Sequence, residues 1–208
     1  MYPLQGRDRK DERTGTEHRI EASVADVGSH NRSSGVGKTT IIKLLLKADP
    51  RLKYSTSMTT RQQRPDEVHG IDYLFVSEEE FQKAIAEGKF AEWSEVYGKY
   101  YGRLEEELNK LMSKSDALIG IDVQGAEKLQ EKYPEGIFIF LLPKSEAALE
   151  AQLRGRKTDD EASIRKRLDA ALQEMKQADN FDYKVINHKI SETVKEVKSI
   201  LADERHKN

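Results

Sequence analysis

The stretch S-G-V-G-K-T-T, from Ser34 to Thr40, has the residue types and spacing of a phosphate-binding loop. It matches the end of the pattern G-x-x-x-x-G-K-[ST], whose glycines let backbone N–H groups turn inward around an anion. Lys38 would then reach the β- and γ-phosphates of a nucleotide, and Thr39 would hold Mg²⁺. The following helix would direct its N-terminal dipole at the phosphates. The alternative is an ordinary glycine turn that starts a helix.

Two arginines form a second group of candidates. Arg61 and Arg64 stand in the segment T-T-R-Q-Q-R-P beside Pro65, which places them on a loop or a strand end. Two planar guanidinium groups in such a position suit a dianionic phosphate. Two arginines considered alone are better explained as ordinary surface residues.

Tyrosine and glutamate side chains could complete such a site. The hydroxyls of Tyr73, Tyr100 and Tyr101 could donate hydrogen bonds to a phosphate. A buried Glu92 could accept two donors, which is what the N1–H and 2-amino edge of guanine presents. Spacing alone favours a packing role for each of these side chains.

The amino-acid composition limits the classes of protein to which this chain can belong. The 208-residue chain is 37% hydrophobic and 35% charged, and its net charge of -2 does not point to nucleic acid as a partner. Cysteine is absent, which excludes disulfides, thiol catalysis and cysteine–zinc sites and agrees with a reducing cytoplasm. The longest apolar run, Gly136 to Pro143, is too short to span a bilayer, and the N-terminus lacks the apolar core of a secretory signal. We therefore expect a cytoplasmic protein without membrane partners.

Strands alternate with helices along most of the chain. Apolar runs predict strands covered on both faces at 117–122 and 137–142, and further strands are expected at 20–27 (a poor candidate), 54–58, 72–76, 90–97 and 183–187. Helices are expected at 39–49, 77–88, 103–114, 124–133, 145–153, 158–178 and 191–204, and Ser77 with Glu80 forms a capping box. The alternation predicts an α/β fold of the P-loop NTPase type, with a mostly parallel sheet flanked by helices.

Three segments stand apart from this predicted sheet. Residues 1–19 are rich in charge and have the composition of a disordered or artefactual tail. Residues 54–101 are polar and strand-rich, and they are interpreted as an inserted mixed α/β subdomain. Residues 154–163 contain glycine and many charges and are a candidate mobile lid. The core would then be built from 20–53 and 102–208.

The order and spacing of several short motifs resemble the guanylate kinase family. The motifs are GVGKTT, SMTTRQQRP, DEVHGIDY, FAEW, YYG, IDVQG, and RGR followed by KRL. Each is weak alone, but their combination in this order is specific. The resemblance covers almost the whole chain from about Ser33 onward.

The resemblance implies transfer of the γ-phosphoryl group of ATP to GMP or dGMP with Mg²⁺, and we expect a monomer or homodimer. Residues 54–101 would be the GMP-binding subdomain. The GMP phosphate would be held by Arg61, Arg64, Tyr73 and Tyr101, and guanine would be read by Ser57, Glu92 and Asp122. ATP would contact Ser34, Gly35, Val36, Gly37, Lys38, Thr39, Thr40 and Asn187, with Thr39 also serving the metal. The catalytic residues would be Lys38, Arg156 and Arg167.

The chain departs from the family's pattern at several positions. Arg32 and Ser33 replace the Gly-Pro that opens the phosphate loop, and the segment before them is short and polar. Gly120 stands where an acidic residue usually supports the metal's water shell. Arg103 stands where a small hydroxyl residue is usual, so one phosphate contact would be missing or replaced. Because Arg32 and Gly120 lie on the ATP and Mg²⁺ side, we expect GMP binding to survive and turnover to be weakened.

Three other interpretations remain open. Residues 1–32 could be a shifted reading of the gene. The chain could be a guanylate kinase-like interaction module that binds GMP or phosphorylated protein partners but not ATP. It could also be a related P-loop kinase with another acceptor. Retained Lys38, Thr39, Arg156 and Arg167 argue against the interaction module.

Overall fold

The computed structural model describes residues 22–26, 37–96, 98–154 and 161–207. Its larger sheet has the order β2-β7-β1-β8-β9. The strands are β1 (Ala22–Asp26), β2 (Leu52–Tyr54), β7 (Asp116–Ile121), β8 (Phe138–Pro143) and β9 (Tyr183–Asn187). Every neighbouring pair in this sheet is parallel, which confirms the predicted sheet type.

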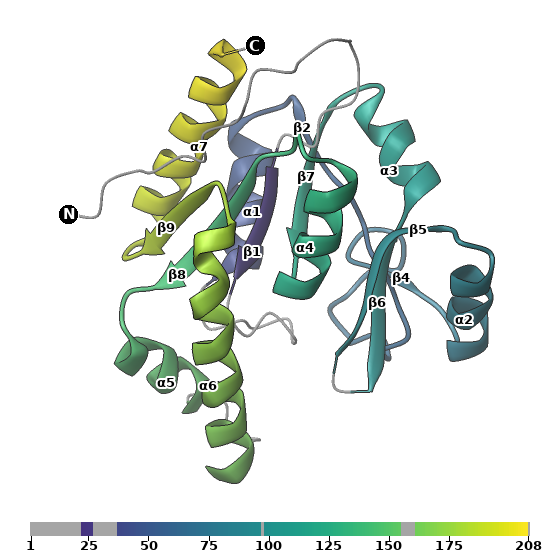
Figure 1. Cartoon of the computed structure of the whole chain (residues 1–208), viewed down its shortest axis with the longest axis horizontal. Helices are drawn as coiled ribbons and strands as arrows, with labels where there is room; N and C mark the ends of the chain where they lie inside the picture. The colour runs from purple at the N-terminus through teal and green to yellow at the C-terminus, as the bar shows by residue number, and fades with distance from the viewer. Residues whose placement is uncertain (1–21, 27–36, 97, 155–160, 208) are drawn as a thin grey trace.

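Helices cover both faces of the parallel sheet (Figure 1). Helix α1 (Lys38–Ala48) lies on one face together with α7 (Ile190–His206), and α4 (Val123–Lys132) lies on the opposite face. Helix α3 (Glu105–Met112) packs against β7 and against both long strands of the second sheet. This arrangement confirms the predicted α/β class, in which continuous apolar strands are covered on both sides.

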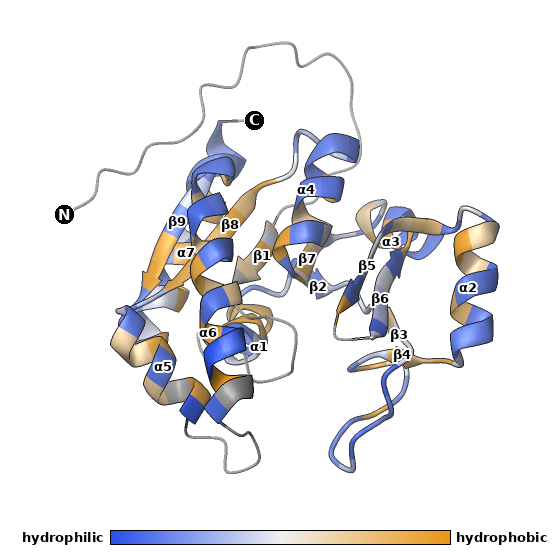
Figure 2. Ribbon diagram, turned by 60° about the horizontal axis from the view of Figure 1, so that its bottom comes forward, coloured by the Kyte–Doolittle hydropathy of each residue, from blue (hydrophilic) through white to orange (hydrophobic). Residues whose placement is uncertain are grey.

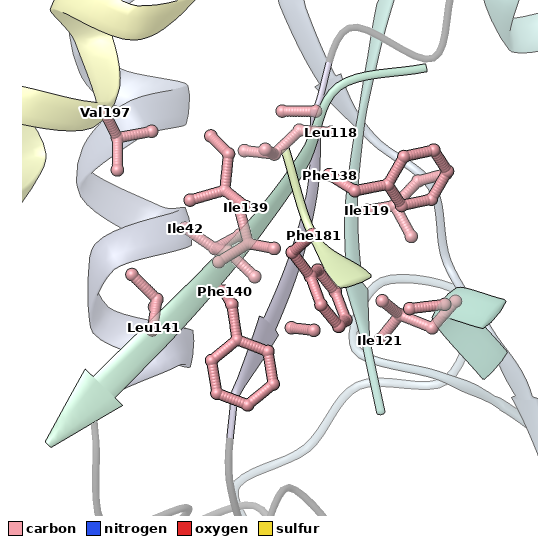
Figure 3. Close-up of a cluster of buried hydrophobic side chains, with 14 of the residues drawn as sticks. Ile42, Leu118, Ile119, Ile121, Phe138, Ile139, Phe140, Leu141, Phe181 and Val197 are labelled. Carbon is pink, nitrogen blue, oxygen red and sulfur yellow. The ribbon is translucent and has the colours of Figure 1, made fainter. Parts of the chain in front are cut away.

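The core lies between these layers. Figure 3 shows side chains from both faces of β7 and β8, among them Leu118, Ile119 and Phe140, in one buried cluster that also includes Ile42 of α1 and Val197 of α7. Apolar residues concentrate on the strands, and polar residues cover the outer faces of the helices (Figure 2). No helix within the described ranges is long and apolar enough to cross a membrane.

Strand β1 is the central strand of the sheet although its sequence is a poor strand candidate. Its residues Ala22, Ser23, Val24 and Ala25 are all fully buried. They pair with β7 on one side and β8 on the other. Small side chains suit this position because α1 and α4 both contact the strand.

The second sheet has the order β4-β3-β6-β5. Its strands are β3 (Met58–Thr59), β4 (Leu74–Phe75), β5 (Phe90–Val96) and β6 (Lys99–Leu104). Helix α2 (Glu78–Ala86) begins with the predicted capping box and packs on this sheet through Phe81, whose ring stacks on that of Phe90 at 4.5 Å. The sheet is mixed, because β3 is parallel to β4 but antiparallel to β6.

Some predicted boundaries are wrong. The single strand expected at 54–58 is divided: Tyr54 ends β2 in the parallel sheet, and Met58 begins β3 in the second sheet. The helix expected from residue 103 begins only at Glu105, because pairing with β5 keeps residues 99–104 extended as β6. Both boundaries are set by hydrogen bonding to neighbouring strands that are distant in sequence.

Helices α5 (Glu146–Arg154) and α6 (Glu161–Met175) form an antiparallel pair beyond the carboxyl ends of β8 and β9 (Figure 1). A 3₁₀ turn at Lys176–Asn180 follows α6, where one continuous helix was expected. Arg154 joins the two helices, because its guanidinium pairs with Glu150 at 2.9 Å and with Glu161 at 2.6 Å.

Candidate nucleotide-binding site

One pocket lies where the carboxyl end of β7 faces the second sheet. Parallel α/β sheets bind ligands at the carboxyl ends of their strands. The pocket combines residues from α1, β7 and the second sheet, and the following residues line it: Lys38, Ser57, Tyr73, Glu92, Val96, Tyr101, Gly120, Ile121 and Asp122. Six of these were predicted site residues, namely Lys38, Ser57, Tyr73, Glu92, Tyr101 and Asp122.

The start of α1 supplies the lysine. Gly37 has a φ of +81°, a left-handed conformation that glycine adopts without steric cost, and it forms the N-cap of the helix. Lys38 follows, and its Nζ donates a hydrogen bond to the carbonyl of Ile121 at 2.8 Å. The carboxyl end of β7 therefore holds this ammonium group in the pocket.

Asn187 lies beside the same turn although it is distant in sequence. A Cβ at Gly37 would stand 3.3 Å from its Nδ2, and its Oδ1 accepts a hydrogen bond from Thr193 at 2.8 Å. Thr39 is half-buried and Thr40 is exposed in the first turn of α1. Ser34, Gly35 and Val36, together with Arg32, lie outside the described residues.

The donor set around α1 agrees with a metal held mainly by nucleotide. The described part of the chain contains no group of three or more His, Cys, Asp or Glu side chains that could cage a metal. Mg²⁺ in kinase sites is held by substrate phosphates, water and one or two protein ligands, so the Thr39 hydroxyl in the first turn of α1 fits as one such ligand.

A buried glutamate organises the predicted phosphate end. Glu67 accepts hydrogen bonds from both terminal nitrogens of Arg61, at 3.0 and 2.7 Å, and from the backbone N–H of Arg64 at 2.8 Å. The guanidinium of Arg61 lies over the ring of Tyr73 at 5.3 Å. The Tyr73 ring in turn meets the Tyr101 ring edge-on at 6.1 Å. This cluster brings together Arg61, Tyr73 and Tyr101, and Arg64 joins it through its backbone N–H. Glu67 is a partner that the sequence did not indicate.

Burial raises the pKa of the Tyr73 phenol, with nearby tyrosines adding to the effect and Arg61 opposing it. The phenol therefore stays protonated at neutral pH. A protonated phenol can donate its O–H to an anion in the pocket.

The other end of the pocket is built around carboxylates. Asp122 caps α4: its Oδ1 accepts the backbone N–H of Gly125 at 2.8 Å, and its Oδ2 accepts the hydroxyl of Ser94, also at 2.8 Å. Ser94 and Glu92 lie on the same face of β5 because strand side chains repeat every two residues. Ser94 was not selected from the sequence, but its position two residues after Glu92 could have indicated that it faces the same site.

Glu92 is the buried acceptor of this end. Burial raises the pKa of its carboxyl to about 7; Arg103 and Lys128 lower the pKa, and Asp122 raises it further. Gly125 leaves room for the carboxylate, because a Cβ there would stand only 2.9 Å from Glu92 Oε2.

Arg103 lies beside Glu92 and Ser57, two of the residues predicted to read guanine. Its side chain is only 1% exposed, and its Nη1 donates to Glu92 at 2.7 Å. Its Nη2 donates to Ser57 Oγ at 2.8 Å and, with longer bonds, to the carbonyls of Gly120 and Ser55. Its Nε is buried without a partner among the described residues, which costs about 1–3 kcal/mol of stability.

Gly120 lines the pocket, and its neighbours fill the space beside it. A Cβ at this position would stand 2.8 Å from Ile42 Cδ1 and 3.4 Å from the Tyr54 hydroxyl. Ile42 and Tyr54 therefore fill the space beside residue 120.

Of the two arginines expected to close over the site, the structure describes only Arg167. Arg167 is half-buried on α6, one of the two helices beyond the carboxyl ends of the strands. Arg156 lies outside the described residues.

The parallel sheet and the glycine-capped first helix define a P-loop-type α/β protein. The family model described as guanylate kinase matches residues 32–204. Curated relatives include the guanylate kinases of Geobacter metallireducens, 42% identical over 83% of this chain and 85% of the relative, and of Caldanaerobacter subterraneus subsp. tengcongensis, 43% identical over 83% and 84%. A crystal structure of guanylate kinase from Anaplasma phagocytophilum has a TM-score of 0.72, 28% identity, and coverage of 91% of this chain and 87% of that one. The chain therefore belongs to the guanylate kinase family, which confirms the resemblance seen in its motifs.

Proposed function

We propose that this chain transfers the γ-phosphoryl group of ATP to GMP or dGMP, giving ADP and GDP or dGDP. The observation that carries the proposal is the pocket that Lys38 of α1 lines together with Tyr73, Tyr101 and Glu92. A nucleotide donor requires a cationic group, which Lys38 supplies at the start of a helix. A nucleoside monophosphate acceptor requires groups for its phosphate and its base, which the tyrosines beside the arginines and a buried carboxylate supply.

Arg61, Arg64, Tyr73 and Tyr101 would hold the acceptor's phosphate. Glu67 positions Arg61 with two hydrogen bonds and also binds the backbone of Arg64, so both arginines belong to one preorganised loop. Preorganised charged donors bind a dianion without the entropic cost of ordering long side chains.

Ser57, Glu92 and Asp122 would read the guanine base. An ionised Glu92 accepts from the N1–H and 2-amino groups of guanine. Adenine has no N1–H, so the buried carboxylate would lose a donor and discrimination would follow.

The chemistry requires positioning and charge neutralisation. The acceptor is a phosphate oxygen that is already ionised at neutral pH, so no general base is needed. Lys38 would hold the β- and γ-phosphates, and Arg156 and Arg167 would approach the transferred group from the α5–α6 side. A bound Mg²⁺, with Thr39 as a ligand, neutralises charge on the phosphates. Asn187, next to Gly37, would lie on the ATP side.

The domain roles follow from the same proposal. Residues 54–101 would form the GMP-binding subdomain, and residues at about 154–163 would form a lid that excludes water during transfer. We propose a cytoplasmic chain, monomeric or homodimeric, without nucleic-acid or membrane partners.

An interaction module is the second candidate, because the Tyr54 hydroxyl and Ile42 adjoin Gly120 where the family's acidic residue would extend. Such a module would bind GMP or a phosphorylated protein without binding ATP. The loss of an acid near the metal affects turnover but leaves the GMP-side residues in place.

Release of ADP at saturating ATP and Mg²⁺, with GMP, dGMP or AMP as acceptor, tests the proposal. We expect release that depends on GMP and dGMP and is far slower with AMP. Calorimetric titration with ATP and with GMP separates the two candidates. GMP binding without ATP binding would favour the interaction module, and the absence of GMP binding would contradict the proposed kinase.

A further inference from the structure

Arg103 stands behind the wall of the pocket that we propose for guanine. Ser57 and Glu92 line the pocket directly, whereas the Arg103 side chain is 1% exposed. One guanidinium group contacts both lining residues: Nη1 donates to Glu92 Oε1 at 2.7 Å, and Nη2 donates to Ser57 Oγ at 2.8 Å. These two bonds connect residues that are 35 positions apart in sequence through a single rigid, planar cation.

The guanidinium determines what each lining residue can offer to a ligand. Arginine only donates hydrogen bonds and stays charged in proteins. Because Ser57 Oγ accepts from Arg103, its own hydroxyl proton is left to point elsewhere, and Ser57 becomes a donor toward the pocket. Because Glu92 accepts a charge-assisted bond, its ionised form, which is an acceptor only, is favoured. The wall therefore presents a donor next to an acceptor.

A donor next to an acceptor complements the hydrogen-bonding edge of guanine but not that of adenine. Guanine presents the O6 acceptor next to the N1–H and 2-amino donors, whereas adenine presents a 6-amino donor next to the N1 acceptor. We propose that Arg103 is a positioning residue that sets the hydrogen-bond polarity of Ser57 and Glu92 and thereby the preference of this site for guanine over adenine. The proposal rests on the proposed function and adds to it a residue that controls base specificity.

Other charges around Glu92 do not replace Arg103. Asp122 at the start of α4 disfavours the ionised carboxylate, and burial does the same. Lys128 of α4 favours it, but its ammonium lies over the Trp93 ring and donates to the Trp93 carbonyl. Without Arg103 the balance shifts toward a protonated Glu92, whose O–H can donate to N1 of adenine.

The test compares Arg103→Met with the unchanged chain, using GMP and AMP as acceptors across about pH 5.5 to 9. Methionine keeps an unbranched side chain and removes all donors. We expect kcat/KM for GMP to fall by about 10- to 100-fold, mainly through KM, while kcat/KM for AMP is unchanged or rises. We also expect the pH at which GMP binding is half lost to move upward by about one pH unit or more.

Arg51→Met is the matched control. Arg51 is 63% exposed, and its carboxylate partner is Asp49. This variant should leave the ratio of GMP to AMP use and the pH profile unchanged. Thermal melting and ATP affinity, measured for all variants, separate a local effect from loss of the fold.

Arg103→Gln covers the outcome in which Arg103→Met does not fold. Glutamine keeps an amide donor within the site but removes the charge, so the upward shift of the pH profile should persist. A folded variant that keeps both the GMP-to-AMP ratio and the pH profile overturns the inference, even if the unchanged chain phosphorylates GMP efficiently. An unchanged chain that does not use GMP overturns the proposed function itself.

Discussion

Replacing Gly125 with alanine should damage the base end of the pocket without a large loss of stability. A Cβ at this position would stand 2.9 Å from Glu92 Oε2 and 2.9 Å from Ile121 Cγ1, closer than side-chain carbons approach other atoms. Gly125 lies in the first turn of α4, where alanine favours the helix by about 0.8–1.0 kcal/mol over glycine. This gain offsets much of the steric cost, so we expect the melting temperature to change by less than about 4 °C.

The carboxylate is the group that must move. Glu92 is buried, and its Oε1 is held by Arg103, so a new methyl group beside Oε2 displaces the carboxylate oxygen that Arg103 does not hold. Loss of one hydrogen bond to a charged group corresponds to about 1.5–3 kcal/mol. We therefore expect KM for GMP to rise by about 10- to 100-fold in a coupled ADP-release assay, with a smaller change in kcat.

Gly88→Ala is the matched control with the opposite expectation. Gly88 has a φ of +64°, and a Cβ there would meet no atom within 4 Å. Alanine in this left-handed conformation costs about 1–2 kcal/mol, so the variant should melt at a lower temperature with an unchanged KM for GMP. If Gly125→Ala also leaves KM for GMP unchanged, the assignment of Glu92 to the acceptor base is refuted.

Three further predictions use the same assay. Lys38→Ala should abolish phosphoryl transfer while calorimetry still detects GMP binding, because Lys38 serves the donor phosphates; an unchanged rate would contradict the phosphate-loop assignment. Arg61→Ala should chiefly weaken GMP binding, by about 10-fold or more, because it removes a charged donor and the guanidinium that pairs with the buried Glu67; a selective rise in KM for ATP would argue against this role. GMP affinity should fall as the pH is lowered from about 8 to about 6, because burial raises the pKa of Glu92 to about 7 and only the ionised carboxylate accepts both guanine donors; a flat profile over this range would show that Glu92 titrates elsewhere.

The local patterns of the sequence identified most of the helices and strands. Continuous apolar runs predicted β7 and β8, and the capping box at Ser77 and Glu80 predicted the start of α2. These features depend on interactions within a few residues or on burial of a whole segment, so they can be read along the chain. The order of the motifs also indicated the guanylate kinase family, which the matching family model and the curated relatives confirm.

The boundaries that failed depend on partners in other strands. Residues 54–58 read as one strand, but hydrogen bonds to β7 and then to β4 and β6 divide them between two sheets. Residues 22–26 read as a poor strand, yet neighbours on both sides and helices on both faces make them the centre of the larger sheet.

Residue types in the sequence indicated candidate site residues, but only the tertiary structure shows which of them lie close together. Lys38, Glu92 and Tyr101 were selected from the sequence, and the fold brings them into one pocket. The position of Arg103 behind Ser57 and Glu92 could not be read from spacing, because side chains on strands of the same sheet become neighbours through pairing and register rather than through distance along the chain. Local patterns along the chain indicated most of the elements and the chemical groups available, whereas the pairing of β6 with β5 and with β3 brought Arg103 beside Glu92 and Ser57.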